Sequence, residues 1–291
     1  MSLIAHIGKP GSFSHLAARA FYGIDHTYMG CASFDEVFQL VSVGDAEIGV
    51  IPVENSLAGS IYENYDLFNK YPLSICGEQY LKVEHFLLSK KGSTTGEDRM
   101  KEIKVVYSHP KALEQCKAFF AAHPWMKPTV AADTATAAAL VAASDDFSMA
   151  AIGSADSAHL YRLAIQARNI EDDKKNYTRF IYVRNTPRAV IPDVIRDPVI
   201  ANANKCSLQF EVAHKPGSLI RTLQVISDHK LNLTKIESRP IHGKPFEYQF
   251  YVDFEFSHEQ TAQMHKILEA IRANCDRLQV LGIYRAGVLE M

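Results

Sequence analysis

The sequence predicts an α/β protein built in two parts, a larger α/β part followed by a smaller α+β part. Apolar strand patterns alternate with helical patterns as far as Val183, which is typical of α/β folds with a largely parallel sheet. Residues 186–204 contain three prolines and no sustained period, which predicts a linker. From residue 205 the predicted elements follow the order strand, helix, strand, strand, helix, strand.

Length and composition indicate an ordinary globular protein. The chain has 291 residues, enough for about two domains, of which 47% are hydrophobic and 22% charged. A formal net charge of -2 without a basic run argues against a nucleic-acid partner. The five cysteines and twelve histidines are dispersed, without a Cys-x-x-Cys or His-x-x-x-His pair. We therefore expect a reducing compartment and no metal site.

The sequence also predicts a cytoplasmic protein without a membrane partner. The N-terminus has no basic segment followed by an apolar core, as a signal peptide requires. The longest apolar run, Ala135 to Ala143, is too short to cross a bilayer.

A glycine loop follows the first predicted strand, residues 4–7. It runs from Gly8 to Ser14 and leads into a helix at His15 to Phe21. Backbone N–H groups at a helix N-terminus bind anions, so a carboxylate would suit this loop; a plain tight turn is the alternative interpretation. The spacing matches neither a Walker loop nor the dinucleotide fingerprint, so no nucleotide cofactor is expected.

Polar residues follow several of the predicted buried strands. Ligands bind at the carboxyl ends of strands in open α/β sheets, although turns and helix caps use the same residue types. The strands are predicted at Glu47–Val53, Leu73–Glu78, Leu81–Ser89, Ile103–Tyr107 and Met149–Ile152. The residues of interest after these strands, or in the first turn of the helix capped by Asp133, are Glu54, Asn55, Ser56, Ser60, Ser108, His109, Gln115, Thr134 and Thr136.

The pentapeptide Asn176–Phe180 opens another strand with an amide, a hydroxyl and a guanidinium close together. Thr178 could donate a hydrogen bond or proton, and Arg179 could bind a carboxylate with two parallel hydrogen bonds. The alternative is a strand threonine and an edge charge. A cleft lined by hydroxyls, helix N-termini and a cation would suit a small polyanionic acid.

The second part predicts one antiparallel sheet with two helices on one face. Apolar residues alternate at every even position from Phe246 to Phe256, and helical spacing recurs from Leu219 to Ile226 and from Met264 to Leu278. The first strand, around Leu208, is expected to be half-buried. Open sheet edges and a bare face favour pairing with a second copy. A binding module and a passive dimerisation domain remain alternatives on fold alone.

In combination, these motifs resemble prephenate dehydratases of phenylalanine biosynthesis, which carry a catalytic domain followed by an ACT regulatory domain. The similarity extends over nearly the whole chain. Each motif is weak alone, but their order and spacing are specific. The motifs are Gly8 to His15, Pro52 to Ser56, Ser108-His109-Pro110 with Gln115, Asn176 to Phe180, Gly217-Ser218-Leu219 and Glu237-Ser238-Arg239-Pro240.

The resemblance implies a catalytic domain at 1–185 with two lobes like a type II periplasmic binding protein, a linker at 186–204 and an ACT domain at 205–291. It implies that prephenate loses its ring carboxylate as CO2 and its ring hydroxyl as water, giving phenylpyruvate. Formation of an aromatic ring drives this reaction, so we expect no cofactor. Arogenate as the substrate, and a non-catalytic amino-acid sensor, are the alternatives.

The resemblance also implies roles for individual residues. The essential threonine of the family maps onto Thr178, its asparagine onto Asn55 and its glutamine onto Gln115. Departure of hydroxide needs a donor at that oxygen, which we expect to be Thr178, aided by placement. Substrate-binding candidates are Arg179, Ser108, His109, Glu54, Ser14, Ser56, Ser60, Thr134 and Thr136.

For the second domain, the resemblance implies binding of L-phenylalanine as allosteric effector between paired copies, in a dimer or a dimer of dimers. The candidate residues are Gly217, Ser218, Leu219, Asn232, Glu237, Ser238, Arg239 and Pro240. The sequence departs from the family pattern at two places. Ser218 replaces the commoner alanine, and Lys9-Pro10 has the reverse of the common order.

Overall fold

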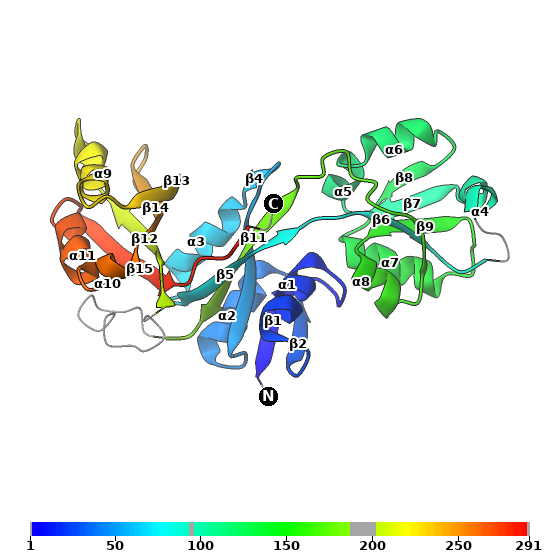
Figure 1. The fold of residues 1–291 in the computed structure, drawn as a ribbon, viewed down its shortest axis with the longest axis horizontal. Coiled ribbons are helices and arrows are strands. Elements are labelled where there is room, and N and C mark those ends of the chain that lie inside the picture. The colour runs from blue at the N-terminus through cyan, green and yellow to red at the C-terminus, as the bar shows by residue number, and fades with distance from the viewer. Residues whose placement is uncertain (1, 93–95, 187–201, 290–291) are drawn as a thin grey trace. The chain divides into compact units, whose positions relative to one another are not determined.

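The computed structural model describes residues 2–92, 96–186 and 202–289 (Figure 1). The chain divides into two compact units. The first unit contains residues 1–37, 54–59 and 81–180, and the second contains residues 38–53, 60–80 and 181–291. The predicted domain boundaries at 185 and 205 stay predictions, because most of the predicted linker lies outside the described residues.

The N-terminal strand and helix of the first unit form as predicted. β1 (Leu3–Ile7) pairs in parallel with β2 (Thr27–Cys31), and α1 (Phe13–Tyr22) connects them. Ser12 caps α1 by accepting a hydrogen bond from the backbone N–H of His15 at 3.3 Å. β2 was not predicted, because three of its five residues are exposed and its sequence has little apolar pattern.

A five-stranded sheet forms the rest of the first unit. Its strand order is β10 (Ala164–Ala167), β6 (Phe86–Ser89), β9 (Met149–Gly153), β7 (Val105–Ser108), β8 (Lys127–Val130). β7 runs parallel to β8 and β9, whereas β6 runs antiparallel to β9 and β10. The expectation of a largely parallel sheet is therefore wrong for this unit, where the sheet is mixed. Burial sets the apolar pattern of a strand, and that pattern does not report its direction.

Helices cover both faces of this sheet (Figure 1). They are α4 (Gly96–Glu102), α5 (Pro110–Glu114), α6 (Lys117–Ala122), α7 (Thr134–Ala143) and α8 (Ala155–Leu160). Asp133 caps α7 as predicted, accepting from the Thr136 N–H at 2.7 Å.

Two helices, α5 and α6, follow Pro110, although the helical spacing of Leu113, Cys116, Lys117 and Phe120 predicts a single helix. The carboxylate of Asp172 accepts hydrogen bonds from the N–H groups of Lys117 at 3.0 Å and Ala118 at 3.1 Å, so it caps a new helix there. The Asp172 N–H in turn donates to the carbonyl of Gln115 at 2.7 Å. A residue far along the chain therefore decides where α5 ends.

Three strands pass from one unit into the other along the chain, namely β3 (Ile48–Asn55), β5 (Ser74–Lys82) and β11 (Tyr177–Arg184). Within the second unit they are neighbours in the order β3, β11, β5. β5 continues past the predicted end at Glu78, so the two strands expected at 73–78 and 81–89 have a different boundary. α2 (Phe34–Val43), the short β4 (Gly59–Ser60) and α3 (Tyr62–Lys70) complete this region.

The ACT-like part of the second unit has the predicted element order. The strands are β12 (Lys205–Glu211), β13 (Asn232–Pro240), β14 (Tyr248–Glu255) and β15 (Arg277–Tyr284), in the antiparallel order β13, β14, β12, β15. α9 (Ser218–Asp228), α10 (His258–Thr261) and α11 (Met264–Arg272) lie on one side of the sheet (Figure 1). The core between sheet and helices is apolar, with Leu208, Phe210, Phe254 and Ile267 fully buried or nearly so.

Along β12 the opposite face of this sheet is covered by protein, which corrects the prediction of a half-buried strand and a bare face; the edge strand β13 has no buried residue. Six of the seven residues of β12 are buried. Lys205 Nζ lies 2.8 Å from Glu78 Oε1, and Gln209 Nε2 donates to Asn69 Oδ1 at 2.6 Å. Strand alternation predicts a polar face, but it cannot distinguish water from a polar protein surface.

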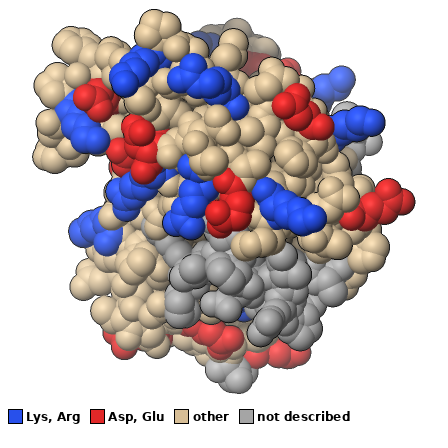
Figure 2. Space-filling model, turned by 90° about the vertical axis from the view of Figure 1, so that its left-hand side faces the viewer, with Lys and Arg blue, Asp and Glu red and all other residues tan. Residues whose placement is uncertain are grey.

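Figure 2 shows one face of the molecule, on which Lys and Arg side chains lie beside Asp and Glu side chains. Among the described helices, none has the length and apolar character needed to cross a bilayer.

Candidate active site

The site is built around Asn55, the last residue of β3, and Thr178, the second residue of β11. Asn55 Nδ2 lies 3.1 Å from Thr178 Oγ1, 2.7 Å from Asn176 Oδ1 and 3.1 Å from the carbonyl oxygen of Tyr177. The predicted proximity of Asn55 to the pentapeptide is therefore present.

The orientation of the Asn55 amide is fixed by the loop that follows it. Asn55 Oδ1 accepts hydrogen bonds from the N–H groups of Leu57 at 3.1 Å and Ala58 at 2.9 Å. The oxygen end of the amide thus faces the loop, and the NH2 end faces β11. Thr178 Oγ1 receives a hydrogen bond from that NH2 group, which leaves the hydrogen of its own hydroxyl for another acceptor.

Asn176 is fully buried beside this pair. Its side-chain oxygen accepts from Asn55, and its backbone oxygen accepts from the Val83 N–H at 2.8 Å. Its Nδ2 atom has no hydrogen-bond partner among the described residues. The pentapeptide had drawn attention to this amide, but the sequence did not predict that its Nδ2 atom is buried without a partner among the described residues.

Ser56 holds the two chain segments together. Its Oγ donates to the Lys175 carbonyl at 3.1 Å and accepts from the Tyr177 N–H at 2.9 Å. Its own N–H donates to the Tyr177 carbonyl at 2.8 Å. In this arrangement Ser56 fixes the start of β11 relative to the loop after β3.

Gln115 lies in a separate hydrogen-bonded pair. It ends α5, and its Oε1 atom is 2.9 Å from Nε2 of His85, a histidine just before β6. The structure thus brings Asn55 and Thr178 together and gives Gln115 a different partner. Sequence reasoning missed His85, because a single histidine before an apolar run resembles a core residue.

Several other predicted substrate residues have local partners. Ser108 is buried and donates to the Ile152 carbonyl at 2.8 Å, which ties β7 to β9. His109 caps α5 by accepting from the Lys111 N–H at 3.2 Å, and burial lowers the pKa of His109. Thr136 Oγ1 donates to Asp133 Oδ2 at 2.8 Å.

The remaining predicted substrate residues differ in exposure and place. Thr134, Ser14 and Arg179 are buried, and Glu54 is partly buried. Ser60 belongs to the second unit, where its Oγ donates to Glu237 Oε2 at 2.7 Å and accepts from Lys235 Nζ at 2.8 Å.

The glycine loop packs against α8. The Gly11 carbonyl accepts from Ser154 Oγ at 3.1 Å and from Ser157 Oγ at 3.0 Å, and the Gly11 N–H donates to His15 Nδ1 at 3.0 Å. Gly11 has φ +92, and a Cβ at this position would lie 2.8 Å from Ser157 Oγ. Glycine is therefore required at this position by both its backbone conformation and its close contact.

Burial lowers the pKa of two histidines near this loop. His6 is fully buried and its ring centroid lies 5.0 Å from that of His15. The pKa of His15 falls to about 4, mainly because of burial. No group of three or more His, Cys, Asp or Glu side chains within the described residues could hold a metal ion.

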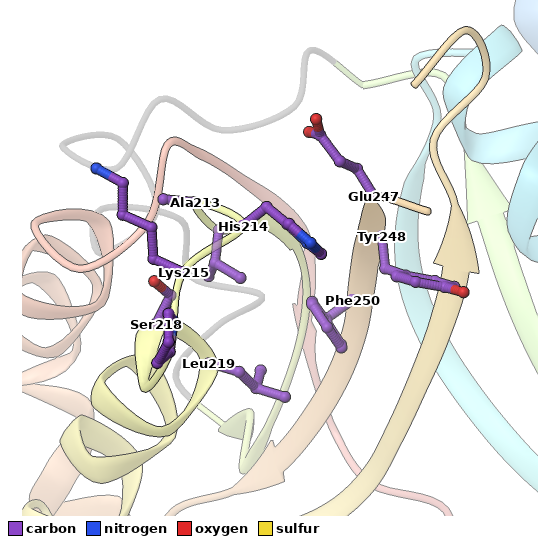
Figure 3. A pocket seen from close by; sticks show the side chains of 10 residues that line it. Ala213, His214, Lys215, Ser218, Leu219, Glu247, Tyr248 and Phe250 are labelled. Atoms are coloured by element: carbon purple, nitrogen blue, oxygen red, sulfur yellow. The ribbon is translucent and has the colours of Figure 1, made fainter. Parts of the chain in front are cut away.

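The second unit contains a pocket of about 360 Å³ at the N-terminus of α9. Ser218 and Leu219 line it from the helix, and Tyr248 and Phe250 line it from β14 (Figure 3). Gly217, with φ +78, caps the helix beside it. The other lining residues are Val212, Ala213, His214, Lys215, Pro216 and Glu247.

Of the residues predicted to bind the effector, only Ser218 and Leu219 line this pocket. Asn232 and Glu237 to Pro240 lie on β13 and do not line it. Arg239 instead pairs with Asp66, with Nε 3.0 Å from Oδ1 and Nη2 2.5 Å from Oδ2. Tyr248 and Phe250 could have been found from the sequence. They belong to the apolar residues at even positions from Phe246 to Phe256, which lie on one face of the strand.

Comparison with known families identifies both parts of the chain. Residues 4–188 match the family model of prephenate dehydratase, and residues 207–275 match the model of the ACT domain. The chain therefore belongs to the prephenate dehydratase family. This family of dehydratase lyases is the one that the motifs predicted, and the predicted α/β fold with an ACT domain is confirmed.

Individual relatives cover nearly the whole chain. The bifunctional chorismate mutase/prephenate dehydratase of Enterobacter agglomerans is 36% identical over 284 residues, covering 97% of this chain and 70% of the relative. The Arabidopsis thaliana protein named arogenate dehydratase/prephenate dehydratase 1, chloroplastic, is 35% identical over 295 residues, covering 97% and 71%. A solved structure described as GqqA, a novel type of quorum quenching acylases, is 30% identical, with 98% of each chain covered and a TM-score of 0.84.

Proposed function

We propose that this protein is a prephenate dehydratase that converts prephenate to phenylpyruvate, CO2 and water. The observation that carries the proposal is the orientation of Asn55. Its NH2 group donates to Thr178 Oγ1 over 3.1 Å, and its oxygen is held by two backbone N–H groups. Thr178 is thereby set up as an acceptor toward Asn55 and a donor toward a ligand.

The reaction needs such a donor. The bond between ring and carboxylate breaks, and its electron pair enters the ring as the bond to the hydroxyl oxygen breaks. The departing hydroxide takes a proton from Thr178 and leaves as water, and a proton from solvent then restores the Thr178 hydroxyl. Negative charge then develops on Thr178 Oγ1, where the Asn55 N–H lies ready to stabilise it.

This geometry refines the role expected for Asn55. Both ends of its amide are engaged by the protein, with Leu57 and Ala58 on the oxygen and Asn176 and Thr178 on the nitrogen. Asn55 therefore acts as a positioning residue for the hydroxyl, and direct contact with the substrate is left to Thr178 and, on our proposal, Gln115 and Arg179. The substrate roles of Ser108, His109, Glu54, Ser14, Ser56, Ser60, Thr134 and Thr136 remain proposals of lower priority.

The decisive experiment is incubation with prephenate while phenylpyruvate is followed. We expect turnover by the wild type and a loss of about 1000-fold in kcat for Thr178→Val, corresponding to about 4 kcal/mol of barrier. Thr178→Ser keeps the hydroxyl and is the matched control, so it should retain most of the rate. Wild-type turnover by Thr178→Val would remove Thr178 from the mechanism.

Arogenate is the second candidate substrate, since the Arabidopsis relative carries both activities in its name. Prephenate and arogenate differ only by a keto or amino group on the side chain. Side-by-side measurement of kcat/KM for both acids distinguishes them, and equal or better use of arogenate would overturn our preference.

Two other functions, an acylase and a non-catalytic amino-acid sensor, can be tested with the same purified protein. An acylase activity, prompted by the description of the solved relative, requires release of an amide-linked acyl group. Among the described residues, the Asn55 amide donates to the Thr178 oxygen, and this favours a hydrogen-bond donor over a base-activated nucleophile at this position. A non-catalytic amino-acid sensor would bind ligand without turnover of either acid.

We also propose that L-phenylalanine binds in the pocket at the start of α9 and lowers activity. The pocket offers apolar side chains from Leu219 and Phe250, and backbone N–H groups at the helix N-terminus suit a carboxylate. Calorimetric titration with L-phenylalanine tests this, with Leu219→Asp expected to abolish binding. We further propose a cytoplasmic homo-oligomer, a dimer or a dimer of dimers, which light scattering would measure.

A further inference from the structure

His85 is held rigidly against Gln115. The side chain of His85 is almost completely buried, and its Nε2 atom lies 2.9 Å from Gln115 Oε1. The His85 N–H donates to Glu171 Oε2 at 2.8 Å, and its carbonyl accepts from the Ile170 N–H at 3.0 Å. Phe13 packs edge-on against the imidazole with ring centroids 5.9 Å apart.

Gln115 is fixed at the same place by its backbone. Its N–H donates to the Lys111 carbonyl at 3.0 Å, and its carbonyl accepts from the Asp172 N–H at 2.7 Å. The Gln115 side chain therefore starts from a fixed backbone, and a half-turn of its terminal amide exchanges the oxygen and nitrogen that face His85. Which end of that amide faces the imidazole depends on which ring nitrogen of His85 carries the hydrogen.

The surroundings of the other ring nitrogen favour one tautomer. Nδ1 of His85 is buried and has no hydrogen-bond partner among the described residues. A hydrogen on Nδ1 would be a buried donor without an acceptor, and such donors are rarer than unpaired acceptors. Burial also lowers the pKa of His85, which favours the neutral ring. The unpaired Nδ1 and the Gln115 oxygen beside Nε2 then favour a hydrogen on Nε2.

We propose that His85 is a positioning residue that donates from Nε2 to Gln115 Oε1 and so makes the Gln115 amide a donor only. The NH2 group of Gln115 then has two hydrogens available for an oxygen of the substrate. This inference rests on the proposed dehydratase function, since Gln115 is one of its predicted catalytic residues. A neutral imidazole sets this orientation without adding charge next to an anionic substrate.

A double-mutant cycle measured with prephenate tests the proposal. We expect His85→Asn, which cannot reach Gln115 with a donor, to lower kcat/KM by about tenfold. His85→Gln restores a donor near the position of Nε2 and should recover most of that loss. In a Gln115→Leu background, His85→Asn should cost less than about twofold, because its effect passes through the missing amide.

Two outcomes would overturn the proposal. One is full additivity of the two losses in folded variants, checked by circular dichroism, and the other is equal activity of His85→Gln and His85→Asn. His159→Asn, at an exposed histidine of α8, is the matched control and should keep wild-type activity.

The tautomer is read independently of turnover from the ¹⁵N chemical shifts of the His85 ring in the intact protein. We expect a neutral ring protonated at Nε2 at pH 7, and protonation at Nδ1 would overturn the proposal. A wild type that turns over neither prephenate nor arogenate would refute the proposed function, whereas the NMR result still decides the orientation of Gln115.

Discussion

Two polar clusters, a partly buried one in the first unit and a buried one in the second, differ in the hydrogen-bonding groups that they leave available. The groups that Asn55 contacts are neutral: Thr178 Oγ1 accepts from the Asn55 amide, and Nδ2 of Asn176 has no partner among the described residues. At the β12–β15 sheet the polar contact is a buried ion pair, in which Lys205 Nζ lies 2.8 Å from Glu78 Oε1. A neutral cluster with unused donors can accept a ligand, whereas a compensated ion pair serves mainly to hold two surfaces together.

The largest effect expected from this comparison is that of Lys205→Met. Both side chains of the pair are almost fully buried, so the substitution leaves the Glu78 carboxylate without its cation. We expect the free energy of unfolding, measured in urea, to fall by about 3–5 kcal/mol. The double variant Lys205→Met/Glu78→Met should recover most of the loss. A decrease under 1 kcal/mol for the single variant would mean that the pair is not the buried contact described.

The neutral, buried His15 of the first unit should make the free energy of unfolding depend on pH. The folded state holds His15 neutral with a pKa of about 4, while the unfolded chain titrates near the ordinary value of 6.5. The unfolded state therefore binds more protons below pH 6.5. The contribution of neutral His15 to the free energy of unfolding is fully present above that pH. It decreases by up to about 1.4 kcal/mol per unit as the pH falls to about 4.

Urea unfolding at pH 7.5 and pH 5 measures this loss, which should reach about 2 kcal/mol. His15→Asn removes the titrating ring and can keep an acceptor for the Gly11 N–H. It should therefore show a smaller difference between the two pH values. An unchanged difference in this variant would assign the acid sensitivity to other groups, such as His6.

The smallest effect is expected for Arg239→Gln, which breaks an ion pair on the same sheet at a more exposed place. The side chain of Arg239 is 24% exposed and that of Asp66 is 45% exposed. Pairs of this kind contribute about 0–1 kcal/mol, and salt screens them. We expect a similarly small change in urea unfolding. A loss as large as that for Lys205→Met would show that burial does not explain the difference between the two pairs.

Much of the fold could be predicted from the sequence where local signals agree. The buried strand that ends at Asn55, the helix capped by Asp133 and the whole order of the ACT-like part follow from periodicity and caps. The break between α5 and α6 could not be predicted, because its cause is Asp172, which lies 55 residues beyond Lys117. The direction of β6 and the burial of β12 also depend on tertiary neighbours.

The candidate site was predictable in part for the same reason. Polar residues directly after buried strands pointed to Asn55, and the pentapeptide pointed to Thr178. Their hydrogen bond spans 123 positions in the sequence. His85 carries no local signal, since histidine occurs commonly in cores, and the pentapeptide does not predict that Nδ2 of Asn176 is buried without a partner among the described residues. Their significance depends on neighbours that only the folded chain provides.

The polar face of the β12–β15 sheet has a consequence for the modularity of the chain. Its contacts with Glu78, Asn69 and the backbone of Tyr65 are made through Lys205, Gln209 and Tyr251. Separation at this surface would expose mostly groups that water can solvate, unlike separation of α9 and α11 from their apolar side. A module that ends in such a surface can be joined to, or detached from, another protein during evolution with little risk of aggregation.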